Sequence, residues 1–287
     1  MTAADAGATS TRLRPDLAGD PPGTVALVRT LLRSDLRERA RGALLTGLGL
    51  AALAVMTFAL YPSVADSFGG FGEELPEGVA NLIGSDYSTL VGWVDGQLVA
   101  GLLPLALLVL GGAVASGLTA GREESGELAL PLSTPAGRRE VVASAFLAAV
   151  GLAAAAALVD VVGFVVGDAL VDDDLGLGAT LVTHLHLWSL AVVGAGLGLL
   201  VSALVARRVV ALSAVVAVAV LSFLVSGFAP TLDGFGWLEV LSPVSWALAH
   251  DPLTDGVGVG GLLAALGVGT VLVAAAVPLY DRRDLDL

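Results

Sequence analysis

The sequence predicts an all-α integral membrane protein with six transmembrane helices, an N-terminal amphipathic helix in the membrane interface and both termini in the cytoplasm. Of its 287 residues, 56% are hydrophobic and 14% charged, and the mean hydropathy is +0.87. This balance is too apolar for a domain with a water-exposed surface. Six apolar runs could cross about 30 Å of hydrocarbon at about 1.5 Å per residue. They are residues 42–60, 98–120, 141–166, 181–205, 209–228 and 259–279.

The orientation follows from the positions of the basic residues. All 14 are Arg. Seven lie before the first span, and the others follow the second, fourth and sixth spans. The loops 61–97, 167–180 and 229–258 contain none. Because basic residues close to the spans stay on the cytoplasmic side, these three loops are predicted to face outward.

Composition also excludes several classes of function. Acidic residues number 27 and the net charge is −13, which argues against nucleic-acid binding, since phosphates need clustered basic residues. The absence of Cys removes disulfides and thiolate sites, and the absence of Lys removes any P-loop lysine. An acidic, Lys-free surface indicates a halophile, most simply a haloarchaeon, with GC-rich coding as the alternative explanation.

The chain is predicted to have three parts: a cytoplasmic segment (1–41), a six-helix transmembrane domain (42–280) and a cytoplasmic tail (281–287). Within the first part, apolar residues recur at helical spacing beside a stripe of Arg, which predicts a helix in the membrane interface. The apolar positions are Val25, Val28, Leu32 and Leu36, and the Arg positions are Arg29, Arg33, Arg37 and Arg41. The alternative is a cytoplasmic lead-in without membrane contact.

The outer segment 235–250 is predicted to be re-entrant or interfacial. It is apolar but too short to span, and Pro243 interrupts it. Its two Trp residues, Trp237 and Trp246, suit the headgroup region.

Small residues and one proline mark the spans for packing. Gly194 and Gly198 in the fourth span, and Gly112 and Ser116 in the second, have the spacing that allows close helix approach. Pro104 is expected to kink the second span, since the preceding turn loses a hydrogen-bond donor.

Three ionisable residues lie within the predicted spans. Counting from Val141 places Asp160 close to the outer interface, so we expect a solvated helix end, although an intramembrane carboxylate can also indicate function. His184 and His186 are about 200° apart on a helix and cannot chelate one metal together. We therefore predict partly solvated histidines, no metal site and no catalytic residue. The alternative function is an ion-coupled carrier or an intramembrane enzyme that uses Asp160.

The cytoplasmic loop 121–140 has the pattern of two short helices with a break between them. Acidic residues precede a small apolar patch at Leu128, Leu130 and Leu132, and Pro131 ends the first helix. Thr134 then caps a helix with Pro135 in its first position. An apolar patch flanked by charge needs a cover, either a partner protein or the chain's own N-terminal helix.

This loop resembles the loop between the second and third helices of ABC-2 type transporter permeases. The matching residues are Glu123, Glu124, Gly126, Leu128, Leu132, Ser133, Thr134, Pro135, Arg138 and Arg139. The likeness extends more loosely to the whole chain through the six spans and the outer segment before the last one.

The resemblance implies a permease subunit that is not itself an enzyme and that binds no cofactor. A separate ABC ATPase subunit would hold ATP and Mg²⁺, and a second permease copy or a paralogue would complete the pathway, commonly for export. It also implies the residues that couple the permease to the ATPase. They are Glu123, Glu124, Leu128, Leu132, Pro135, Arg138 and Arg139.

The predicted topology can be tested by labelling, because the chain has no Cys. Ser88→Cys should react with an impermeant maleimide in intact cells, since its loop is predicted to face outward. Ser133→Cys should react only after lysis. The reverse result would overturn the orientation.

Overall fold

The computed structural model describes residues 23–68, 89–127 and 137–282. Every regular element in these residues is helical, and six helices are long and apolar enough to cross a membrane, which confirms the predicted fold class. Five spans are α1 (Thr24–Phe68), α7 (Arg138–Asp168), α8 (Leu177–Leu204), α9 (Arg208–Phe228) and α11 (Val259–Arg282). The second span is composite: α3 (Leu90–Val94), the π-helix η3 (Asp95–Leu102), α4 (Leu103–Leu118) and α5 (Ala120–Glu124).

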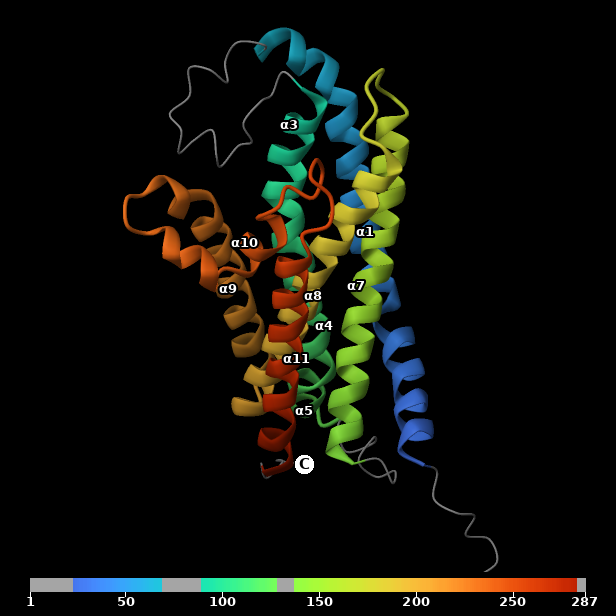
Figure 1. Ribbon diagram of the computed structural model, residues 1–287. Helices are drawn as coiled ribbons and strands as arrows, with labels where there is room; N and C mark the ends of the chain where they lie inside the picture. Colours follow the sequence, from blue (N-terminus) through green and yellow to red (C-terminus); the bar gives the residue numbers. More distant parts are fainter. Residues whose placement is uncertain (1–22, 69–88, 128–136, 283–287) are drawn as a thin grey trace, which may run out of the picture.

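The helices run along one common direction, and α1 begins at the end of the bundle where α11 finishes (Figure 1). The short helix α5 and the first turns of α7 and α9 lie at this end as well (Figure 1). We call it the Arg-bearing end, because Arg122, Arg138, Arg208 and Arg282 belong to these elements.

The predicted interfacial helix is the first part of α1. It continues into the first span as one helix of 45 residues, and α1 runs beside α7 over much of its length (Figure 1). No Gly or Pro separates Val25 from Arg41, so nothing in the backbone ends the helix there. Arg29, Arg33 and Arg37 are exposed, whereas Leu36 is partly buried in the core.

The second span contains the predicted irregularity at Pro104. The eight residues before α4 form the π-helix η3, and the backbone N–H of Leu103 donates to the carbonyl of Leu98, five residues back. A proline cannot donate to the preceding turn and its ring crowds that turn. Widening of the helix to a π-helix directly before Pro104 accommodates both effects.

The predicted small-residue motifs of α4 and α8 pack against each other. A Cβ atom on Gly198 would lie 2.8 Å from the carbonyl oxygen of Gly112, and one on Gly112 would lie 3.0 Å from the carbonyl oxygen of Gly194. The same close approach joins α8 to α11, where a Cβ on Gly196 would lie 2.5 Å from the carbonyl oxygen of Gly269. Glycine therefore sets the distances between α4, α8 and α11.

The segment after α9, which was predicted to face outward, turns back toward the bundle (Figure 1). It contains two short 3₁₀ helices, η4 (Ala229–Thr231) and η5 (Gly236–Leu241), followed by α10 (Pro243–Leu248). Ser242 caps α10 by accepting from the N–H of Ser245, and its hydroxyl donates to the carbonyl of Ser222 in α9 at 2.9 Å. Three apolar side chains of η5 are exposed, Trp237 by 62%, Val240 by 71% and Leu241 by 65%, as expected for a segment in the membrane interface.

The close packing of α4 and α8 can be tested with alanine. Gly198→Ala should lower the thermal midpoint of the purified protein, at a cost of about 1–3 kcal/mol, because the added methyl group meets backbone that has to shift. Gly267→Ala in α11 is the control, since nothing lies within 4 Å of its Cβ position. It should be neutral or stabilising by up to about 1 kcal/mol. Equal midpoints for the two variants would contradict this account of the packing.

Candidate functional site

The structure describes four of the seven residues predicted to couple the chain to a partner. Glu123 and Glu124 lie on α5, and Arg138 and Arg139 form the first turn of α7, all at the Arg-bearing end. Leu128, Leu132 and Pro135 lie outside the described residues, as does Leu130. The predicted apolar patch and its possible contact with α1 therefore remain predictions.

An ionic cluster centred on Arg122, buried except for the exposed Glu38, joins α5 to α1. One terminal nitrogen of Arg122 lies 2.7 Å from Asp35 Oδ1 and 2.5 Å from Glu38 Oε2. Arg122 is 8% exposed and Asp35 only 2%, so both charges are largely removed from water. The other oxygen of Asp35 accepts a hydrogen bond from the hydroxyl of Ser144 in α7. We call Asp35, Glu38, Arg122 and Ser144 the Arg122 cluster.

Further contacts tie α4 and α9 to the same place. Arg39 in α1 donates to the carbonyl of Gly117 at 3.1 Å, which satisfies one of the free carbonyls at the end of α4. Glu124 accepts from the backbone N–H of Arg208 at 3.2 Å, where a carboxylate suits the N-terminus of α9. A polar cavity of about 360 Å³ lies between these residues.

Arg138 and Arg139 contact the chain's own last helix. Arg138 donates to the carbonyls of Tyr280 and Asp281 at 3.1 and 2.8 Å, so it caps the end of α11. Arg139 pairs with the carboxylate of Asp281 at 2.8 Å, but its side chain is 75% exposed, which makes this pair weak. Both arginines thus fasten the start of α7 to the end of α11 at the edge of the predicted loop.

The sequence reasoning missed the Arg122 cluster. Its one signal is Asp35, which lies three residues after Leu32 and seven after Val28, on the apolar stripe of the amphipathic helix. A carboxylate on such a stripe is buried when the helix packs, and therefore needs a cation. The identity of that cation could not be read from the sequence, because Arg122 is 87 positions away.

Asp160 is not a solvated helix end, so that expectation is wrong. It is 0% exposed and lies eight residues before the end of α7, where His184 of α8 meets it with Nε2 3.1 Å from Oδ2. The imidazole Nδ1 donates to the carbonyl of Thr180 at 2.8 Å, so Nε2 is the nitrogen that is bare in the neutral ring. A hydrogen bond between Nε2 and Oδ2 thus requires one more proton, on either atom.

The expectation of partly solvated histidines is also wrong, because His184 is 4% exposed and His186 only 1%. His186 accepts from the N–H of Gly258 through Nε2 at 3.1 Å, on a different side of α8 from Asp160. Among the described residues, no group of three or more His, Cys, Asp or Glu could hold a metal ion.

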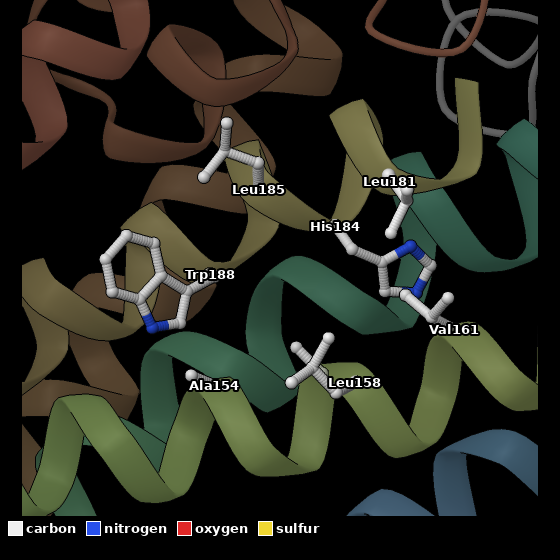
Figure 2. A pocket seen from close by; sticks show the side chains of 8 residues that line it. Ala154, Leu158, Val161, Leu181, His184, Leu185 and Trp188 are labelled. Atoms are coloured by element: carbon white, nitrogen blue, oxygen red, sulfur yellow. The ribbon is translucent and has the colours of Figure 1, made fainter. Parts of the chain in front are cut away.

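A shallow apolar groove of about 230 Å³ lies between α7 and α8, beside the Asp160–His184 pair. Figure 2 shows Trp188 at one end and His184 at the other, with Leu158 and Leu185 on opposite sides. The indole N–H of Trp188 donates to the carbonyl of Val150 at 3.1 Å, and both ring nitrogens of His184 already have partners. The groove therefore offers almost only apolar surface, as a wall that faces acyl chains should.

Comparison with known proteins places this architecture in a family. A family model described as ABC-2 family transporter protein matches residues 29–285, which include all six spans and the Arg122 cluster. No curated protein matches the chain. Since the family model extends over nearly the whole chain, this multi-pass membrane protein belongs to the ABC-2 family of ABC transporter proteins.

Proposed function

We propose that the chain is the permease subunit of an ABC transporter and that a separate ATPase drives it by docking on residues 121–140. The observation that carries the proposal is the position of α5. This short helix begins the predicted docking loop and is fastened to α1 by Arg122 and to α9 by Glu124. A displacement of the loop by the ATPase would therefore be transmitted to α1 and α9 together.

ATP binding and the second half of the transport pathway are assigned to partner chains. The sequence has no Lys, so it cannot supply the phosphate-binding lysine of a P-loop, and ATP with Mg²⁺ belongs to the ATPase. The family also supports a dimeric pathway, formed with a second copy or a paralogue, and export as the direction of transport. The Arg-bearing end then faces the cytoplasm, in agreement with the distribution of Arg along the chain.

The docking loop can be tested with charged substitutions in its apolar patch. Leu128→Asp combined with Leu132→Asp should abolish co-purification with the ABC ATPase, tested with any ATPase encoded beside this gene. Burial of two Leu side chains against a partner contributes roughly 3–6 kcal/mol before the cost of association, so their loss should break the complex. Ser34→Asp is the control, because Ser34 is an exposed polar residue of α1 that does not belong to the apolar stripe. A double variant that still assembles and hydrolyses ATP would refute docking through this loop.

One observation favours a second function, transport coupled to protons. Asp160, His184 and His186 are the three ionisable residues within the six predicted spans, and two of them form a buried pair that needs a shared proton. An ionisable residue inside a membrane span is a candidate functional residue, because burying it there is costly.

Proton coupling should be visible without ATP. In liposomes that contain the purified chain and an entrapped pH-sensitive dye, a proton-coupled carrier would dissipate a pH gradient, and Asp160→Asn would stop it. Asp255→Asn, which changes an exposed outer carboxylate, is the matched control. If the chain is an ATP-driven permease, we expect the dye to report no flux above that of empty liposomes for any of the three proteins.

A further inference from the structure

The short helix α5 is separated from α4 by a break in the helical backbone. Thr119 stands between them with φ −115° and ψ −88°, values far from those of an α-helix. The regular hydrogen bonding of α4 ends at this residue, so α5 does not simply prolong a stiff rod. A displacement of the docking loop can therefore turn α5 relative to α4.

Helix α1 contacts the chain on both sides of this break. On one side of Thr119, Arg39 of α1 binds the carbonyl of Gly117 in α4. On the other side, Asp35 and Glu38 of α1 hold Arg122 in α5 at 2.7 and 2.5 Å. A turn of α5 about the break must therefore either carry α1 with it or separate Arg122 from its carboxylates.

Separation is the costly alternative. Arg122 and Asp35 are both buried, and pulling one away leaves an unpaired charge in a poorly hydrated site, which is strongly destabilising. Asp35 is held further by the hydroxyl of Ser144. The exposed pair of Arg139 and Asp281 at the same end would separate far more easily.

Helix α1 can carry a displacement far into the bundle. It is one helix over 45 residues and packs closely on α7, where a Cβ on Gly47 would lie 2.8 Å from the carbonyl oxygen of Ala156. Further along, Phe58 meets Phe164 edge to face with ring centroids 5.6 Å apart. Movement of Asp35 therefore reaches residues that lie about 23 positions, or about 35 Å, along the same helix.

We propose that Arg122 is the positioning residue that carries the movement of the docking loop into α1, through Asp35 and Glu38. The inference rests on the proposed function, because it assumes that an ATPase moves this loop. It assigns α1, rather than α4 alone, as the helix that the ATPase drives.

The test measures the position of α1 in the complex with the ATPase. Spin labels at Ser34→Cys in α1 and Leu204→Cys in α8 are both exposed at the Arg-bearing end, and electron spin resonance gives their distance. Trapping the ATPase with ADP and vanadate should shift this distance in the otherwise unmutated chain. Arg122→Gln combined with Asp35→Asn should lose at least half of the shift while ATPase binding and hydrolysis persist. This double variant leaves no single charge buried at the pair.

Arg37→Gln is the matched control, since Arg37 is an exposed residue of α1 close to the cluster, and the full shift should remain. Glu38→Gln is the milder variant if the double variant fails to assemble, because it removes only the exposed partner of Arg122, and it should reduce the shift measurably but by less than half. An unchanged shift in the assembling variant, or no shift in the unmutated complex, overturns the role of Arg122 alone. Failure of any ATPase to bind the unmutated chain overturns the proposed function, and this inference with it.

Discussion

Hydrocarbon offers no hydrogen-bond partners, and the architecture of this protein depends on that constraint. The backbone is satisfied within helices, and polar side chains inside the bundle bond either to their own helix, as Thr119 does to Ala115, or to a neighbouring span. The indole N–H of Trp93 donates to the carbonyl of Thr57 at 2.8 Å, and that of Trp188 to Val150. Asp160 obeys the same rule through His184, which explains why a carboxylate in a membrane helix is fully buried rather than solvated.

Lipid also changes how the helices hold together. Acyl chains are as apolar as leucine, so burial of leucine between helices gains little, and close contact decides the packing. Glycine supplies that contact between α4, α8 and α11, and between α1 and α7. The π-helix before Pro104 makes the second span irregular at the end of α4 away from the predicted docking loop, and the break at Thr119 does so at the other end. Rigid contacts thus lie next to a locally widened helix within a single span.

Charge is concentrated at the Arg-bearing end, and its effect depends on burial. Arg139 and Asp281 form an exposed pair that water and salt screen, so it contributes little to holding α7 against α11. Arg122 and Asp35 are buried, so these two charges are costly to separate and, with Ser144, hold α1, α5 and α7 together. An ATPase that docks beside the Arg122 cluster could therefore move α1 through contacts that the permease already contains.

The sequence by itself determined the six spans, the membrane as solvent and the small-residue faces of α4 and α8, and it predicted a kink at Pro104, before which the structure has a π-helix. These follow from patterns within one helix, where hydropathy, glycine spacing and proline act locally. By resemblance it also predicted a docking loop, of which Leu128, Leu132 and Pro135 lie outside the described residues. The partners of Asp35 and Asp160 and the anchoring of Arg138 on α11 were decided only by the tertiary structure. Each depends on which helices become neighbours, and a residue's own segment does not specify the group that faces it across a packed interface.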